Sequence, residues 1–66
     1  MYDVKEVRAE LARRGLTSRK ICLKIGMNER TFYRKFNNGK LSLPEAKAIS
    51  RAAGFDAETA ARLFLL

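Results

Sequence analysis

The 66-residue chain contains no histidine and no tryptophan, and Cys22 is its only cysteine. Histidine and cysteine supply most zinc ligands and catalytic nucleophile–base pairs, so zinc clusters, histidine-based triads and disulfide frameworks are excluded. The seven Asp and Glu residues are scattered. A chain of this length buries only about 60% of the surface that its unfolded form exposes, which leaves little room for a deep pocket. We therefore expect no enzymatic activity, no cofactor or metal, and no small-molecule ligand.

Long hydrophobic runs are also missing. A membrane span needs roughly 18 consecutive apolar residues, and a signal peptide needs an apolar h-region; the sequence contains neither. A lone cysteine is typical of a reducing compartment. These features predict a soluble cytosolic protein with no membrane association.

Glycine and proline are scarce, at four residues and one residue, and they lie where helices are expected to begin or end. "SLPE" at residues 42–45 is a capping box with proline inside the first turn, and Asp3, Thr17, Asn28 and Asp56 are further candidate N-caps. No turn resembles a hairpin. The sequence predicts five helices, at about residues 4–14, 17–25, 28–36, 42–53 and 56–64.

Each expected helix carries an apolar stripe at spacings of three and four residues, which is the pattern of a helix with one buried face. Together the stripes make one core, and all five helices are needed to cover it. We predict a compact all-α five-helix bundle that forms a single domain over residues 1–66. The expected core residues are Val4, Val7, Leu11, Ile21, Cys22, Ile25, Phe32, Phe36, Leu43, Ala46, Ile49, Ala53, Ala60, Leu63 and Phe64.

Charge is strongly uneven along the chain. The net charge is +7, from 14 Lys and Arg against 7 Asp and Glu. Nine of these bases and a single acid, Glu29, lie between Arg13 and Lys40, so this segment carries +8 while the flanks carry five bases and six acids. A basic patch is what binding to a polyanion requires, although it also promotes solubility. The uneven placement favours polyanion binding.

The second and third expected helices are separated by a turn of about three residues at Gly26, which is typical of a helix-turn-helix motif. A small residue, Cys22, lies where two such helices would approach closely. Phe32 follows on the buried face of the third helix. The spacing of these three residues predicts a helix-turn-helix formed by the second and third helices.

The segment "GLTSRKICLKIGMNERTFYRKFNNGKLSLPEAKAISRAAGF" resembles the Cro/repressor-type (lambda-repressor-like) helix-turn-helix family of phage and bacterial transcription regulators. The resemblance covers nearly the whole chain. It implies a sequence-specific double-stranded DNA-binding regulator of the bacterial cytoplasm or nucleoid, such as a small repressor or Cro-like protein. Ser18 stands where many members have a phosphate-contacting glutamine, and Cys22 stands where alanine is usual.

The third helix offers the candidate base contacts. At 100° per residue, Phe32 and Phe36 define its inner face, and Arg30 and Arg34 point away from it. The N-terminal part of the second helix of such a motif reads base edges in the major groove, and arginine on guanine is the commonest specific contact. Two alternatives stay open: Glu29 complements the helix dipole, and Tyr33 covers the core. The expected base contacts are Glu29, Arg30, Tyr33 and Arg34.

Phosphate contacts are expected from residues that border this helix. The N–H groups that open the second helix, and the loop after the third, suit anion binding. The candidates are Ser18, Arg19, Thr31, Asn38 and Lys40.

The apolar tail "LFLL" suggests a homodimer on DNA through Leu63, Leu65 and Leu66. Packing of the tail onto the first helix is the alternative. Two other functions remain open: a weakly specific DNA- or RNA-binding accessory protein, and a protein-interaction adaptor that kept the fold without DNA binding.

Overall fold

In the computed structural model, which describes residues 2–65, the chain forms helices only. Within this range there is no β-strand, which confirms the all-α prediction. The first helix ends one residue earlier than expected, because Arg14 serves as its C-cap. The described residues form α1 (Val4–Arg13), α2 (Ser18–Ile25), α3 (Glu29–Asn37), α4 (Leu43–Ala53) and α5 (Ala57–Phe64).

Side-chain caps begin every one of these helices, at the residues that the sequence predicted. The Asp3 carboxylate accepts from the N–H groups of α1, and Thr17, Asn28 and Asp56 act in the same way for α2, α3 and α5. At α4, Ser42 and Glu45 form the expected reciprocal capping box. Each cap satisfies N–H groups that a helix leaves without a partner, so the helix boundaries are fixed locally.

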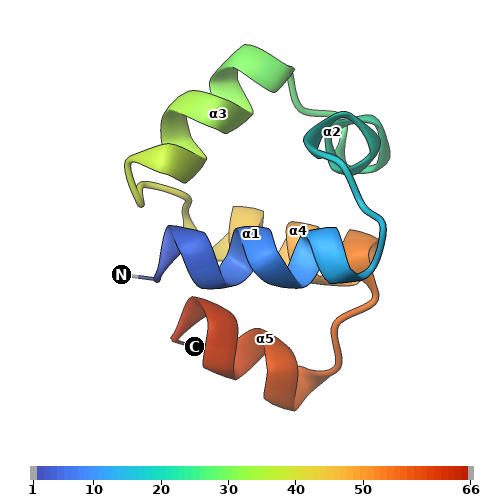
Figure 1. Ribbon diagram of the computed structural model, residues 1–66. Helices are drawn as coiled ribbons and strands as arrows, with labels where there is room; N and C mark the ends of the chain where they lie inside the picture. Colours follow the sequence, from blue (N-terminus) through green and yellow to red (C-terminus); the bar gives the residue numbers. More distant parts are fainter. Residues whose placement is uncertain (1, 66) are drawn as a thin grey trace.

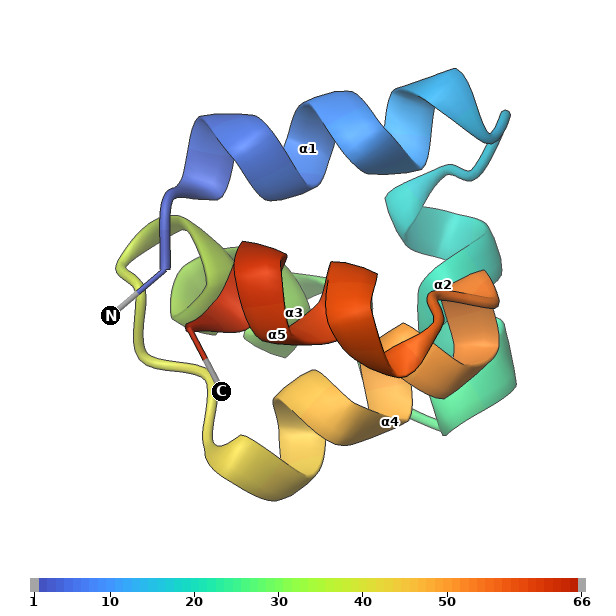
Figure 2. The same cartoon turned by 90° about the horizontal axis from the view of Figure 1, so that it is seen from below.

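The helices enclose one core (Figures 1 and 2). In Figure 1, α1 crosses the front, α5 lies below it, α4 lies behind, and α2 and α3 lie above. α2 packs against α3 and α4, and α5 packs against α1 and α4. Val7, Ile21, Phe32 and Ile49 have no exposed surface, so four of the helices each place a side chain at the centre. This packing positions α2 and α3 on one side of the molecule, as Figure 1 shows.

The core differs from the predicted one at a few positions. Leu43 was expected in the apolar stripe of α4, but its side chain is 52% exposed. It occupies the first position of the helix, ahead of the buried face that begins at Ala46. Tyr2 and Phe55, which lie outside the helices, are buried instead.

The C-terminal tail divides between core and surface. Leu63 is buried in the core, whereas Leu65 is 65% exposed; Leu66 lies outside the described residues. Leu63 nevertheless lines a surface hollow between α1 and α5, and the homodimer through these leucines stays a prediction. None of the helices in the described part of the chain is long and apolar enough to cross a membrane.

Candidate nucleic-acid interface

The connection between α2 and α3 consists of Gly26, Met27 and Asn28. Gly26 has a φ of 71°, in the left-handed region that glycine adopts without steric cost, and it ends α2. The Met27 N–H donates to the Cys22 carbonyl at 3.1 Å, and the Asn28 carboxamide then accepts from the first N–H groups of α3. The two helices therefore pack against each other through a short turn at the predicted position.

The two faces of α3 differ as the helical period predicted. Phe32 and Phe36 are buried and stack with their ring centroids 5.2 Å apart. Arg30 and Arg34 lie on the exposed face, and neither side chain has a hydrogen bond or ion pair with any residue between 2 and 65. Two guanidinium groups, four residues apart, therefore lie on the solvent-exposed face of α3.

Tyr33 and Glu29 flank this pair. The Tyr33 side chain is 45% exposed and meets the Phe32 ring edge to face at 6.0 Å, so it covers part of the core while half of it remains on the surface. Glu29 is exposed in the first turn of α3. Burial raises the pKa of the Cys22 thiol, and the Glu29 carboxylate raises it further.

Most of the predicted phosphate contacts lie at the start of α2 and in the loop after α3. Ser18 and Arg19 open α2, and Thr17 Oγ1 accepts from Lys20 N–H, so the N–H groups of Ser18 and Arg19 have no acceptor within the described chain. Asn38 is the C-cap of α3. The Lys40 N–H donates to the Lys35 carbonyl at 2.8 Å, which fixes the loop, while the Lys40 side chain is exposed.

Ser18 and Thr31 are the least accessible of the five phosphate candidates. Both residues are half-buried, whereas Arg19, Asn38 and Lys40 are exposed. The Thr31 N–H donates to the Asn28 side chain at 3.3 Å. The structure thus brings all of the candidates onto or beside α2, α3 and the following loop, with uneven exposure.

The nine cations of the basic segment divide into two groups. Four have partners: Arg13 and Arg14 pair with Glu10 at 2.6 and 2.9 Å, Lys35 pairs with Glu45 at 2.9 Å, and Lys24 donates to the Ala52 carbonyl at 3.2 Å. The side chains of the other five have no hydrogen bond or ion pair with any residue between 2 and 65. We call them the unpaired cations: Arg19, Lys20, Arg30, Arg34 and Lys40.

The ion pairs affect the titration of their carboxylates. Hydrogen bonds from Arg13 and Arg14 hold the pKa of Glu10 below its ordinary value. The pKa of Glu45 is lowered by the Ser42 N–H of the capping box and then by Lys35. These cations therefore neutralise acids of the protein itself, and the unpaired cations do not.

Two residues near this surface were absent from the predicted contacts. Lys20 is an unpaired cation that directly follows Arg19, and its exposed place in the first turn of α2 could have suggested it. Arg8 of α1 donates to the Asn37 side chain at 2.6 Å, and its guanidinium lies 5.8 Å from the centre of the Phe36 ring. Because Arg8 and Asn37 are 29 residues apart, no local signal in the sequence brings them together.

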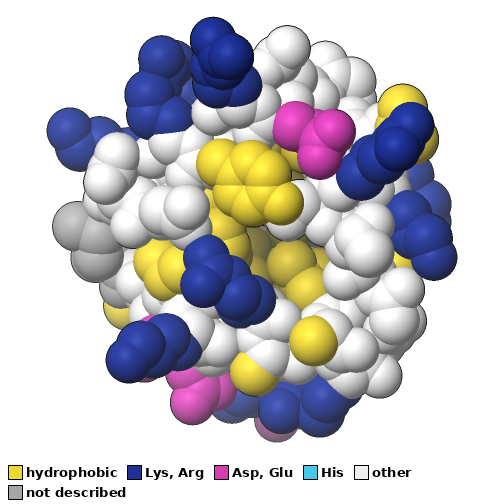
Figure 3. Space-filling model, turned by 45° about the horizontal axis from the view of Figure 1, so that its top comes forward, with side chains coloured by type: hydrophobic (Ala, Val, Ile, Leu, Met, Phe, Trp, Pro, Cys, Tyr) yellow, Lys and Arg dark blue, Asp and Glu magenta, His cyan; other side chains and the backbone are white. Residues whose placement is uncertain are grey.

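The surface around these residues is mixed rather than uniformly basic. Figure 3, which brings the α2–α3 side of the molecule toward the viewer, shows Lys and Arg side chains around a centre of apolar side chains.

Within residues 2–65, no group of His, Cys, Asp and Glu side chains is arranged to hold a metal ion. Comparison of the chain with protein-family models, with characterised proteins and with solved structures finds no match.

Proposed function

We propose that the protein binds double-stranded DNA sequence-specifically, with α3 in the major groove, and acts as a small repressor or Cro-like regulator that occupies an operator. One observation carries the proposal. Five cations whose side chains have no partner among residues 2–65 lie on α2, α3 or the loop after α3, whereas the rest of the described chain has three, Lys5, Lys47 and Arg51. Unpaired cations on one surface supply the electrostatic footprint of nucleic-acid binding.

In this proposal, α3 reads the bases. Arg30 and Arg34 project from its exposed face, and an arginine can donate two hydrogen bonds to guanine O6 and N7. Glu29 can accept from cytosine N4, and the exposed half of Tyr33 gives an apolar contact beside them. A helix has the width that the major groove of B-DNA admits.

Phosphates are held by the start of α2, by Thr31 of α3 and by the loop after α3. At α2, the free N–H groups of Ser18 and Arg19 add to the positive end of the helix dipole. After α3, Asn38 and the Lys40 side chain lie on an ordered loop, and Thr31 lies beside the reading face. Such contacts position a protein on the duplex without reading its sequence.

Substitution of one arginine and one lysine distinguishes contacts to bases from contacts to phosphates. Arg34→Ala should cost about 1 to 3 kcal/mol of binding free energy per half-site and relax the preference at one base-pair position. Lys40→Ala should weaken binding to all sequences by similar factors and lower the slope of log affinity against log salt by about 1. Both effects are measured by salt titration on a site selected from a random duplex library and on scrambled duplex.

Lys47→Ala is the matched control, because Lys47 is also an exposed lysine but lies on α4, outside the proposed surface. It should bind both duplexes like the wild type. If Arg34→Ala and Lys40→Ala lose equal affinity on both duplexes, α3 does not read bases and the protein is a weakly specific DNA- or RNA-binding accessory factor. If the wild type binds neither duplex, the proposal of DNA binding is wrong, and an RNA-binding factor or an interaction adaptor takes its place.

A further inference from the structure

A hollow lies on the surface between α4 and α5, and we call it the α4–α5 hollow. It has a volume of about 300 Å³. Ala57 and Ala60 of α5 form one wall, and Lys47, Ser50 and Arg51 of α4 form the other. Both helices face the viewer in Figure 2, with α3 behind them. The described residues that line the hollow all belong to α4 or α5, so this surface is separate from the proposed DNA-binding surface.

The two cations of the hollow have no partner within the described chain. The side chains of Lys47 and Arg51 are exposed and form no hydrogen bond or ion pair with any residue between 2 and 65. Because they are four residues apart on α4, they lie on the same face of the helix, one turn apart. Like charges at this spacing destabilise a helix slightly. The pair therefore adds nothing to the stability of α4.

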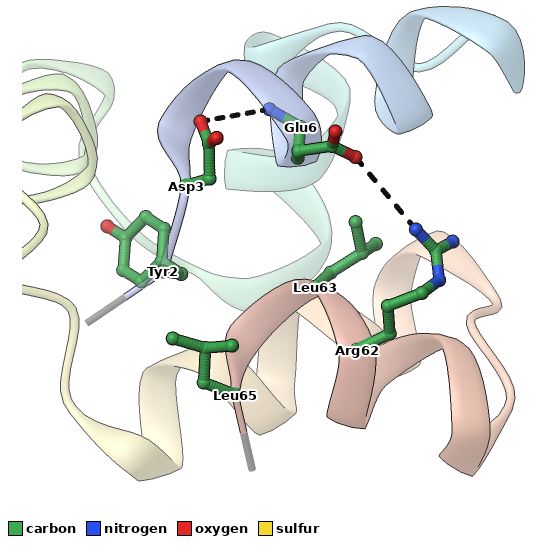
Figure 4. A pocket seen from close by; sticks show the side chains of 6 residues that line it. All are labelled: Tyr2, Asp3, Glu6, Arg62, Leu63 and Leu65. Carbon is green, nitrogen blue, oxygen red and sulfur yellow. Dashed lines mark hydrogen bonds and ion pairs between the residues drawn. The ribbon is translucent and has the colours of Figure 1, made fainter.

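The hollow between α1 and α5 has a different distribution of charge. It is larger, at about 530 Å³, and Figure 4 shows that it holds both signs of charge. Arg62 Nη1 lies 3.9 Å from Glu6 Oε2, and Asp3 also lines this hollow. By contrast, no acid within residues 2–65 lines the α4–α5 hollow. Two uncompensated cations beside an apolar wall are complementary to a ligand that carries carboxylates beside an apolar side chain.

A second copy of this chain does not offer such a ligand. Four of its seven acids act within the fold as helix caps or ion-pair partners. These are Asp3, Glu10, Glu45 and Asp56. The other acids, Glu6, Glu29 and Glu58, lie on three different helices, so they form no pair one turn apart. The net charge of +7 also makes two copies repel each other. The ligand is therefore a different protein.

We infer that the α4–α5 hollow binds an acidic amphipathic helix of another protein, with two carboxylates on Lys47 and Arg51 and one apolar side chain against Ala57 and Ala60. Acids four residues apart on a helix have the spacing of the two cations, because both pairs are one turn apart. Ligand sites have volumes of about 300 to 1,000 Å³, so this hollow suits a single large side chain. An amphipathic helix in an apolar groove is a recurrent mode of peptide recognition.

Fluorescence anisotropy at low ionic strength tests this inference with the full chain and a synthetic peptide. The probe is an alanine-based helix of about 16 residues, long enough to be helical, with two glutamates four residues apart and a leucine three residues after the first. A scrambled peptide of the same composition should bind at least about tenfold more weakly, because charge alone does not fill the hollow. Lys47→Glu and Arg51→Glu should each weaken binding of the probe by about tenfold. Glutamate is a good helix former and both positions are exposed, so these variants should fold.

Lys5→Glu is the matched control, because it makes the same change in net charge. Lys5 is an exposed lysine on α1 that does not border the α4–α5 hollow, so this variant should bind the probe like the wild type. A second probe, with lysines in place of the two glutamates, should bind the double variant Lys47→Glu/Arg51→Glu better than the first probe does. Such a recovery shows that the variant is folded. Equal losses in all three single variants, or a wild type that binds neither peptide or both equally, would overturn the inference.

NMR of the wild type locates the peptide without any substitution. The backbone amide signals of Lys47, Arg51 and Ala60 should shift when the first probe is added, and those of Arg30 and Arg34 should stay fixed. Shifts confined to α3 would overturn the inference, because the peptide would then merely imitate a nucleic acid.

Addition of duplex DNA separates this inference from the proposed function. Duplex that binds through α3 should leave the peptide in place, since the two surfaces are separate. Duplex that displaces the peptide, or that itself shifts the Lys47 and Arg51 signals, would assign the hollow to nucleic acid and overturn the inference. If the protein binds the peptide but no duplex, the inference stands and the proposed function fails.

Discussion

The cations of this small protein fall into a paired set and an unpaired set. Beside α1, Arg13 and Arg14 bind Glu10, and the Arg14 guanidinium also lies 4.8 Å from the centre of the Phe55 ring. On α2, α3 and the following loop, five cations have no partner among residues 2–65. The excess of +8 in the sequence between Arg13 and Lys40 therefore overstates the charge available to a ligand. What matters for binding is which cations the fold leaves unpaired.

This contrast separates stability from binding. The buried residues Phe32 and Phe36 anchor α3 in the core, whereas Arg30 and Arg34 on its exposed face have no side-chain partner among residues 2–65. Substitutions should therefore fall into two classes, with losses of folding stability for one set of residues and losses of DNA affinity for the other.

Phe32→Ala should have the largest effect, because it removes the core side of α3. Phe32 is fully buried and contacts the rings of Phe36 and Tyr33. Truncation of a buried phenylalanine costs about 3 to 5 kcal/mol of unfolding free energy, which is most of the stability expected of a small domain. Urea unfolding followed by circular dichroism measures it. Arg34→Ala, two residues later, should change stability by less than about 0.5 kcal/mol; a larger loss would show that the exposed face does support the fold.

Tyr2→Phe should lower the unfolding free energy by less than Phe32→Ala does. The buried Tyr2 hydroxyl donates to the Phe36 carbonyl at 2.8 Å, so it holds the end of α3 to the N-terminal segment. Loss of one such hydrogen bond costs about 0.5 to 1.5 kcal/mol, and the ring packing stays intact. The same urea titration detects it. An unchanged midpoint would mean that water replaces the hydroxyl at no cost.

Acid should lower the unfolding free energy. The pKa values of Glu10, Glu45 and Asp56 are all lowered in the fold, the last by the Thr59 N–H. The folded state thus binds these protons less tightly than the unfolded state. Their stabilisation is complete above the ordinary pKa of a carboxylate, about 4, and is lost as the pH falls through the lowered values.

The chain has no histidine, so the unfolding free energy should be nearly constant from pH 7 to about pH 5 and should decline below that range. Urea midpoints at pH 7, 5 and 3 measure the decline. Glu45→Gln should make it shallower, because one of the shifted carboxylates is then absent. Greater stability at pH 3 than at pH 7 would contradict the assignment.

Arg13→Ala should have the smallest effect of these substitutions on DNA binding. It tests directly whether pairing within the protein decides which cations bind DNA. Arg13 is paired with Glu10, whereas Arg19 is unpaired, although both are exposed arginines of the same basic segment. Arg19→Ala should lower the slope of log affinity against log salt by about 1, and Arg13→Ala should leave the slope almost unchanged. Equal losses in the two variants would show that intramolecular pairing does not decide which cations bind phosphate.

The local structure could be predicted from the sequence. The five caps and the residues that end α2 and α4 act through neighbours within a few positions, so the helix bounds follow from local chemistry. The helical period likewise placed Phe32 inside and Arg30 and Arg34 outside. The all-α class and the exposed face of α3 belong to this part of the prediction.

Tertiary structure alone decided the contacts between residues far apart in the chain. Tyr2 reaches the end of α3 across 34 positions, and Arg8 reaches Asn37 across 29. The same packing exposed Leu43, buried Tyr2 and Phe55, and gave Lys35 a partner in Glu45, ten residues away. Local propensity carries no information on such contacts, because they depend on how whole helices pack. Which cations remain available to a ligand is therefore a property of the folded chain, whereas the excess of cations is a property of the sequence.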